Sequence, residues 1–281
     1  MYKARFERDD GKNFYFDREQ GVIFDISPLS ELDVTVATSQ GFQQVGTTVE
    51  NRSIGGVSRK ISGTILGEAS DAKRRMLNVF APFASGRLVF NEKYYCNAVV
   101  KKTPALAAKS YDCAFTLMLY CAGPYWLKLK ESGYVLGGYT PAFSFPVNYA
   151  TPHCFGIRNL SAFTNCRNSG DVDALYSVEF SALADVTDYG ITNVYTLETM
   201  RFHDTLKYGE KMRVYRSAGR LYVEKDTADG TVDAFETLDE SSNLFYMHPG
   251  DNVIKPEGDS AENLVVSIRF SDAYTGVYDG M

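Results

Sequence analysis

Apolar and polar residues alternate along much of the chain, a pattern typical of β-strands. The clearest example is the stretch 110–126, SYDCAFTLMLYCAGPYW. Its odd positions from Tyr111 to Cys121 are all apolar. Because successive side chains of a strand point to opposite faces, this pattern predicts one long strand with a continuous core face. Gly123 and Pro124 interrupt the pattern, since glycine adopts unusual backbone angles and proline cannot donate to a β ladder. We expect this strand to be the last one of a first domain.

The rest of the first half predicts further strands and one helix. Residues 39–56 are polar, contain glycine and lack a steady period, which predicts a long loop. Residues 70–82 predict the helix, with Ser70 as its cap and an apolar stripe that includes Met76 and Val79. The predicted strands cover 3–7, 13–16, 22–26, 32–38, 57–66, 86–91 and 93–101. One helix among antiparallel strands predicts a β-sandwich or split barrel over residues 1–127.

The second half predicts strands only. Residues 128–149 are rich in Gly, Tyr and Pro, which is typical of a connector, with room for one strand at most. Strands separated by turn residues follow at regular spacing, and the last, over 264–270, alternates cleanly. We therefore expect a second β-sandwich over residues 128–281.

Composition and charge narrow the class of protein. The chain has 281 residues, of which 14% are aromatic and 23% charged, which favours a mainly β protein of two domains. No run of about 18 apolar residues predicts a membrane span, and the charged N-terminus argues against a secretory signal. The five cysteines are widely spaced, odd in number and contain no C-x-x-C, which favours buried thiols in a reducing compartment.

The net charge of −6 hides an imbalance between the two halves. Residues 1–130 contain 18 Lys and Arg against 13 Asp and Glu, a net charge of +5, whereas the remainder contains 11 against 22, a net charge of −11. Opposite charge on two domains favours lateral packing in an assembly. No block of five like charges occurs, so neither half is typical of a nucleic-acid binder.

No motif for catalysis, metal binding or cofactor binding stands out. The three histidines lie about fifty residues apart, without a carboxylate or cysteine at ligand spacing: His153, His203 and His248. The stretch 225–236 resembles a calcium-binding loop, but Lys225 and Thr227 occupy positions that require carboxylates. A phosphate loop, a dinucleotide fingerprint and a G-x-S-x-G motif are all absent. We expect no catalytic residue, no metal and no cofactor, although paired carboxylates of a glycoside hydrolase leave no sequence pattern.

Several aromatic residues near the connector admit two interpretations. Tyr134 and Tyr139 could stack on sugar rings, or they could cover the junction between the domains. Trp126, the single tryptophan, and its neighbour Tyr125 follow the strand break directly, so we expect both to pack at that junction.

Taken in order, motifs of the whole chain resemble the siphophage distal tail protein family. In the first half these are Arg59-Lys60-Ile61, the capped helix, Gly86-Arg87-Leu88 and Gly123-Pro124-Tyr125-Trp126. In the second half they are Asn168-Ser169-Gly170-Asp171, Gly209-Glu210, Leu238-Asp239, Phe245-Tyr246-Met247, Pro249-Gly250-Asp251-Asn252-Val253-Ile254 and Tyr274-Thr275-Gly276-Val277. The first fifty residues match least.

The resemblance implies a structural protein rather than an enzyme. It implies a tail-tube-like N-terminal β domain that forms a hexameric ring, and a galectin-like C-terminal β-sandwich that projects from it. The ring would join the tail tube protein to a tail-tip or baseplate hub protein, with a receptor-binding protein as a further partner. DNA would pass through without being specifically bound, no membrane would be involved, and the location would be the virion tail after synthesis in the host cytoplasm.

Two other functions compete with this hypothesis. The second sandwich could be a host cell-wall carbohydrate-binding module, with Tyr134 and Tyr139 stacking on sugars. The chain could also be a wall-degrading enzyme.

Overall fold

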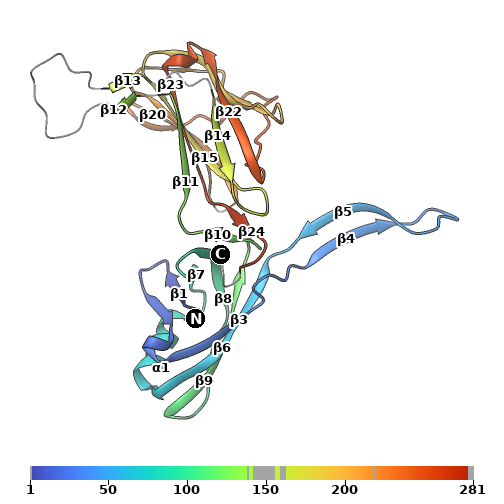
Figure 1. The fold of residues 1–281 in the computed structure, drawn as a ribbon, viewed down its shortest axis with the longest axis vertical. Coiled ribbons are helices and arrows are strands. Elements are labelled where there is room, and N and C mark those ends of the chain that lie inside the picture. Colours follow the sequence, from blue (N-terminus) through green and yellow to red (C-terminus); the bar gives the residue numbers. More distant parts are fainter. Residues whose placement is uncertain (1, 138, 142–155, 159–162, 218, 278–281) are drawn as a thin grey trace, which may run out of the picture. The chain divides into compact units, whose positions relative to one another are not determined.

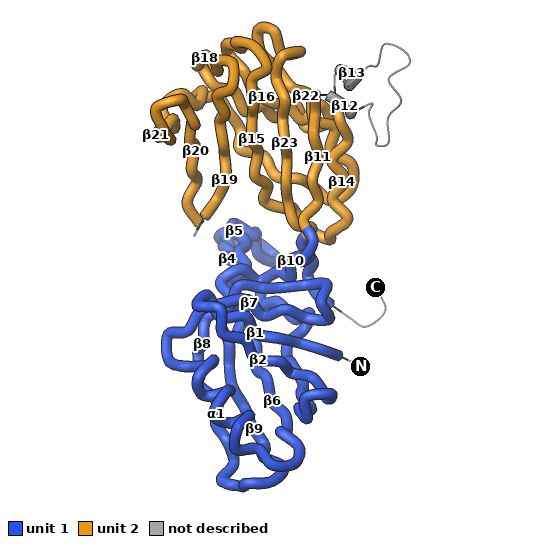
Figure 2. Tube along the Cα trace, turned by 90° about the vertical axis from the view of Figure 1, so that its left-hand side faces the viewer, with its two compact units in different colours: residues 1–130, 273–281 blue, residues 131–272 orange. Residues whose placement is uncertain are grey.

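The computed structural model describes residues 2–137, 139–141, 156–158, 163–217 and 219–277, with the backbone alone for 139–141 and 156–158. The chain divides into two compact units: residues 1–130 with 273–281, and residues 131–272 (Figure 2). The sequence analysis predicted a second domain that runs to residue 281, and the structure corrects this prediction, because residues from Ala273 onward belong to the first unit. β24 (Ala273–Tyr274) pairs antiparallel with β10 (Trp126–Lys128), so the ladder joins this late segment to the first unit.

The first unit is built on one large antiparallel sheet (Figure 1). Along the sheet, the order is β2 (Asn13–Phe16), β1 (Ala4–Arg8), β7 (Ser85–Phe90), β8 (Tyr94–Leu106), β9 (Tyr111–Cys121), β6 (Val57–Glu68) and β3 (Val22–Ser27). β10 pairs with β8 as well as with β24. A short 3-10 turn, η1 (Arg18–Gln20), connects β2 to β3.

β9 confirms the strand predicted from the alternating pattern. From Cys113 to Cys121 its odd positions are buried, whereas Tyr111 at its start is 68% exposed. β9 lies between β8 and β6, so it bonds to a neighbour along both edges. This central position explains why its apolar face is continuous. The strand is not the last of the unit, however, because β10 and β24 follow it in the same sheet.

The one α-helix described, α1 (Ser70–Val79), buries Met76 and Val79 against the sheet. The N-cap is Ala69 rather than Ser70, and no side chain caps the helix. The backbone N–H of Ala69 donates to the carbonyl of Ser110 at 3.1 Å, and Ser110 directly precedes β9. This hydrogen bond fixes the start of the helix beside the sheet. Phe80 at the helix end joins a cluster of rings with Phe6, Phe14 and Phe16.

A two-stranded hairpin projects from the first unit and forms a sheet of its own: β4 (Val34–Ser39) and β5 (Thr48–Ile54) (Figure 1). We call residues 34–54 the arm. The sequence predicted a strand over 32–38 and a long loop over 39–56, and the loop prediction was wrong. Every residue of both strands is exposed, so no burial imposes the alternation by which strands are recognised.

The second unit is a sandwich of two antiparallel sheets with a shared apolar core. One sheet has the order β11 (Ser132–Leu136), β23 (Leu264–Phe270), β15 (Tyr176–Ala182), β19 (Lys211–Ser217), β20 (Arg220–Thr227) and β21 (Gly230–Asp233). The other contains β14 (Thr164–Asn168), β22 (Gly250–Asp259), β16 (Val186–Asn193) and β17 (Thr199–Arg201), with β18 (Thr205–Leu206) beside β16. Two 3-10 turns, η2 (Phe235–Thr237) and η3 (Ala261–Asn263), lie between strands. A small separate pair is made by β12 (Tyr139–Pro141) and β13 (Gly156–Arg158).

The predicted connector is in part a strand of the second unit. β11 pairs with β23 from Ser132↔Phe270 to Leu136↔Val266, and Leu136 is buried in the core. Its sequence, SGYVL, contains too few apolar residues to be recognised alone. Its partner β23 alternates as predicted, and pairing with this regular strand holds β11 in the sheet. The mainly β fold with one helix is thus confirmed over the described residues. In that part of the chain, no helix is long and apolar enough to cross a membrane.

Candidate assembly surface

The arm has one apolar face, which its strand register creates. Val34 lies opposite Ile54, and Val36 lies opposite Arg52, so these four side chains share a face. Between Ala37 and Thr38 the register shifts by one residue of β5. This bulge places Val49 opposite Thr38, on the same face as the other apolar residues, where regular pairing would have turned it away.

The opposite face of the arm is made of small polar residues and one alanine. Cross-strand pairing puts Thr35 beside Ser53, and Ser39 beside Thr48. The ribbon is therefore amphipathic, as a strand pair is when one of its faces is to be covered.

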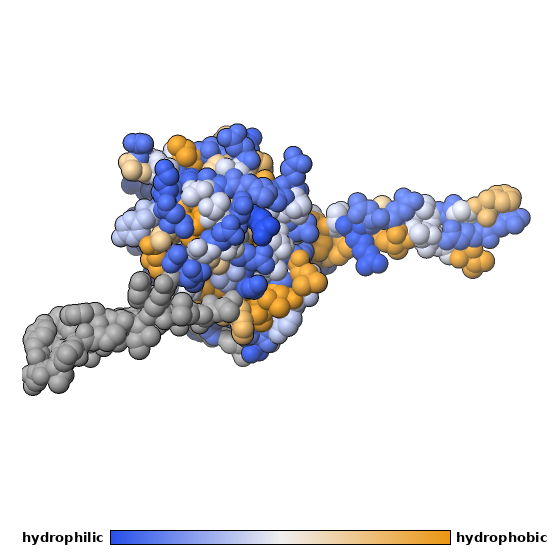
Figure 3. Space-filling view, turned by 90° about the horizontal axis from the view of Figure 1, so that it is seen from above, coloured by the Kyte–Doolittle hydropathy of each residue, from blue (hydrophilic) through white to orange (hydrophobic). Residues whose placement is uncertain are grey.

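No residue of the described chain covers the apolar face. Val34, Val36, Val49 and Ile54 are 40–53% exposed, and at the tip Phe42 and Val45 are 95% and 100% exposed. Figure 3 shows hydrophobic patches along the arm among hydrophilic residues. An isolated hairpin is marginally stable in water, and a contiguous exposed apolar patch marks an interaction site. The arm is thus the strongest candidate for an assembly contact.

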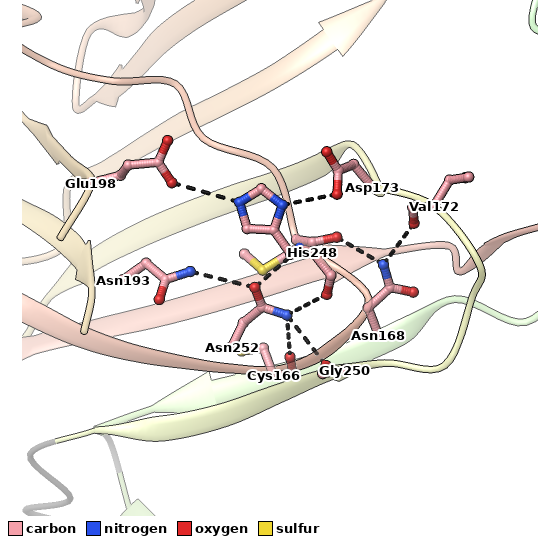
Figure 4. A network of polar contacts seen from close by, with 10 residues as sticks. Cys166, Asn168, Val172, Asp173, Asn193, Glu198, His248, Gly250 and Asn252 are labelled. Atoms are coloured by element: carbon pink, nitrogen blue, oxygen red, sulfur yellow. Dashed lines mark hydrogen bonds and ion pairs between the residues drawn. The ribbon is translucent and has the colours of Figure 1, made fainter. Parts of the chain in front are cut away.

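In the second unit, two asparagines of the motifs form a buried polar network (Figure 4). Asn252, 1% exposed, accepts from the His248 backbone N–H at 3.0 Å and donates to the Cys166 carbonyl at 3.2 Å. Asn168, equally buried, donates to the Met247 carbonyl at 2.7 Å and accepts from the Gly170 backbone N–H at 2.8 Å. These side chains add hydrogen bonds to backbone groups of the turns and strand ends around them, and so satisfy polar groups in the interior. Asn168 and Asn252 therefore have a structural role, in which they fix the conformation of the neighbouring turns.

His203 and His248 each lie between two carboxylates in the second unit. The His203 ring lies 2.9 Å from Asp188 and 2.8 Å from Asp239, and these hydrogen bonds, to Asp188 first, raise the pKa of His203 above its usual value. His248 lies 2.8 Å from Asp173 (Figure 4). The two histidines use separate carboxylates, and His153 lies outside the described residues. Among the residues described, no group of three His, Cys, Asp or Glu could hold a metal ion.

Trp126 and Tyr125, predicted at the domain junction, lie in the first unit. Trp126 is fully buried there, and its indole N–H donates to the Leu29 carbonyl at 2.9 Å. The guanidinium of Arg59 lies 4.3 Å from the centre of its ring. Tyr125 is half-buried. Trp126 therefore has a defined role in the core of the first unit, and a role of either residue at the junction stays a prediction.

Of the tyrosines predicted to stack on sugars, Tyr134 is engaged in the second unit. Its hydroxyl donates to the Arg167 carbonyl at 3.1 Å, and its ring stacks on Phe270 with centroids 5.8 Å apart. Both contacts are those of a packing residue. The backbone of Tyr139 in β12 pairs with that of Arg158 in β13, and the side chain of Tyr139 lies outside the described part of the chain. Binding of sugars by these tyrosines stays a prediction.

No protein-family model and no curated protein matches the chain. Among solved structures, the crystal structure of the SPP1 Dit protein (gp 19.1) is similar with a TM-score of 0.66. The match covers 97% of this chain and 99% of that one at 11% sequence identity. The chain has the fold of the SPP1 Dit protein. That protein is described as a paradigm of the hub adsorption apparatus in phages that infect Gram-positive bacteria.

A second solved structure agrees. A chain of the phage p2 baseplate, in its activated conformation with Sr, is similar with a TM-score of 0.51 at 11% identity, covering 99% of this chain and 100% of that one. The Dit fold thus extends over nearly the whole chain, which confirms the fold expected from the resemblance to distal tail proteins. The sequence missed the arm, and the excess of Val at 34, 36, 45 and 49 in a stretch almost free of charge was the pattern that could have revealed it.

Proposed function

We propose that the chain is a structural subunit of a phage tail, a distal tail protein that assembles into a ring at the tail end and acts as a hub for other tail parts. The Dit fold supports this role, because the SPP1 Dit protein with that fold belongs to a hub adsorption apparatus. We propose a non-catalytic role, six-fold ring closure, passage of DNA through the ring, and contacts with a tail tube protein and a tail-tip or baseplate protein.

The observation that bears most weight is the uncovered apolar face of the arm. Burying the four half-exposed side chains contributes about 1 kcal/mol each, and the two tip residues about 2 kcal/mol each, so a complete contact gains roughly 8 kcal/mol before the costs of association. A gain of this size supports a specific contact between subunits. It also explains why a hairpin without a partner in its own chain is retained.

The geometry of such a contact favours a ring over a two-fold dimer. If the arm of one subunit packs on a different surface of the next, the contact is heterologous, and heterologous contacts close into rings when the rotation permits. The opposite charge of the two halves, +5 and −11, is compatible with unlike surfaces meeting.

The test replaces one methyl group by a hydroxyl at each of two positions of the apolar face, with nearly unchanged side-chain shape. Val36→Thr with Val49→Thr places two hydroxyls where the contact forms, which costs about 3 kcal/mol per arm, or on the order of a 100-fold weaker interface. We expect wild-type protein, alone or with a tail tube protein, to give rings by mass photometry and negative-stain imaging, and the double variant to remain monomeric.

The matched control changes the polar face. Thr35→Ser with Thr48→Ser alters two exposed positions of the same strands, so ring formation should be retained. At concentrations where the protein is monomeric, both variants should melt as the wild type does, since exposed substitutions change stability by about 0.5 kcal/mol or less. Rings formed equally well by the Val36→Thr/Val49→Thr variant would contradict the proposed role of the arm.

A further inference from the structure

Two cysteines meet in the core of the first unit. Cys96 on β8 and Cys121 on β9 place their sulfur atoms 3.3 Å apart, with one thiol as hydrogen-bond donor to the other. The two side chains are 1% and 0% exposed. β8 and β9 are antiparallel neighbours, so backbone hydrogen bonds hold the two sulfur-bearing strands together. A disulfide has an S–S length of about 2.05 Å, so the sulfur atoms must approach each other by only about 1.2 Å.

The other described cysteines have different surroundings. The Cys113 thiol donates to the backbone carbonyls of Ala107 and Ala114, at 3.3 and 3.4 Å. Cys166 belongs to the second unit, where burial raises the pKa of its thiol to about 12. Since the thiolate is the reactive form, the raised pKa disfavours oxidation of Cys166, and the structure places no second thiol beside Cys113 among the described residues. Both therefore serve as internal controls.

A buried cation lies beside the cysteine pair. Arg59 is 1% exposed and donates to the carbonyls of Pro28 and Pro124, at 2.6 and 3.0 Å. Its Nε has no hydrogen-bond partner, and among the ion pairs of the described residues it has no carboxylate. A buried charge without a counter-ion is costly, and a thiolate would supply the missing negative charge.

The electrostatics distinguish the two sulfurs. A hydrogen bond from the Cys96 thiol, together with the positive charge of Arg59, lowers the pKa of Cys121 to about 7 against the opposing effect of burial. The same hydrogen bond and burial raise the pKa of Cys96. Cys121 is thus the sulfur that ionises first, and Cys96 is the one that keeps its proton.

We propose that Cys96 and Cys121 form a redox modification site, a thiol pair that a peroxide converts to a disulfide linking β8 to β9. The Cys121 thiolate attacks one oxygen of hydrogen peroxide, the O–O bond breaks, and the hydroxide released takes up a proton to become water. Cys121 is then a sulfenic acid. The Cys96 sulfur attacks Cys121, the S–O bond breaks, and the departing hydroxide takes the Cys96 proton as a second water. The two sulfurs together lose two electrons, and the peroxide gains them.

The disulfide would close a loop between two residues 25 apart in the chain and restrain the strands of the first unit. Restraining a loop of this size raises the melting temperature by about 5–10 °C. If the proposed tail location is correct, the chain is made under reducing conditions and works outside the cell, so oxidation would follow release. The chemistry itself does not depend on the arm or on the ring, and its failure would leave the proposed function untouched.

The experiment uses the full chain treated with hydrogen peroxide and analysed by peptide mass mapping without reduction. We expect one cross-linked species that joins the Cys96 peptide to the Cys121 peptide, two hydrogen atoms lighter than the sum of the two free-thiol peptides. The Cys113 and Cys166 thiols should remain free over the same time. In Cys96→Ser the reaction should stop at the sulfenic acid of Cys121, which dimedone then labels, whereas Cys121→Ser should leave the Cys96 thiol unmodified. Cys113→Ser should cross-link as the wild type does.

Three results would overturn the proposal. One is a folded wild-type protein whose Cys96 and Cys121 thiols both remain free after Cys113 or Cys166 has reacted. Another is a dimedone label on Cys113 or Cys166 in place of Cys121 in the Cys96→Ser variant. The last is cross-linking that leaves the melting temperature of the first unit unchanged.

Discussion

Replacing Trp126 with alanine should destabilise the first unit and leave the second unit unchanged. The indole is fully buried, its N–H donates to the Leu29 carbonyl, its face receives Arg59, and its ring lies 5.8 Å from that of Phe90. Each of these partners belongs to the first unit. The substitution therefore creates a cavity and also leaves the partly buried Leu29 carbonyl without this donor.

The expected cost follows from these contacts. Truncating a buried tryptophan to alanine costs about 3–5 kcal/mol, and loss of the hydrogen bond to a partly buried carbonyl adds about 1 kcal/mol. Loss of the cation–π contact, worth about 2 kcal/mol when desolvated, overlaps with the first figure. A total near 5 kcal/mol lowers the melting temperature of the first unit by roughly 15 °C.

Hydrogen exchange measured by peptide distinguishes the two units in one experiment. In Trp126→Ala, amides of β8 and β9 should exchange faster, while amides of β15 and β23 should keep wild-type rates. Trp126→Phe is the matched control, because it keeps a ring beneath Arg59 and loses chiefly the hydrogen bond to Leu29, at a cost of about 2 kcal/mol. Equal protection of β8 and β9 in wild type and Trp126→Ala would refute the assignment of Trp126 to this core.

Two further predictions concern the second unit. Asn252→Ala removes the acceptor of the His248 N–H and the side-chain donor to the Cys166 and His248 carbonyls, so calorimetry should show the second unit destabilised by about 3 kcal/mol, whereas Asn165→Ala at an exposed position of β14 should change nothing. The raised pKa of His203 means that the folded state binds its proton more tightly than the unfolded state does. The stabilisation from this group is therefore fully present below the usual histidine pKa of about 6.5 and is lost as the pH rises through the raised folded value. The melting temperature of the second unit should therefore fall as the pH rises across that interval, and His203→Gln should remove this dependence on pH. An identical dependence in the variant would assign it to other groups.

Much of the fold could be predicted because a strand that is buried on one face alternates apolar and polar residues along the sequence. β9 and β23 are examples, since each lies inside a sheet and shows an alternating apolar face. The helix was predicted for the same reason, because its stripe packs on the sheet. Its cap was predicted wrongly, because the helix begins one residue earlier than expected for a Ser70 cap, with Ala69 as the N-cap and its N–H donating to the Ser110 carbonyl, a contact distant in sequence.

The candidate surface was less predictable. The apolar face of the arm includes Val49 only because a bulge in β5 moves this residue to the side of Val36, and pairing register is not visible in one strand alone. In the same way, β11 is too short and irregular to be recognised without β23. Tyr134 could stack on a sugar or pack in a core, and its contacts with Phe270 and Arg167 are those of packing.

By itself the sequence determined the class of protein: a mainly β chain in two parts, one helix, opposite charge on the halves, and a series of motifs that resembles distal tail proteins. These features depend on composition, local periodicity and motif order, which the chain shows directly. Tertiary structure decided the rest. It brought Cys96 beside Cys121 and Arg59, returned the C-terminal strand to β10 in the first unit, and left one face of the arm uncovered. Each of these depends on residues far apart in the chain, and only the pairing of strands places such residues together.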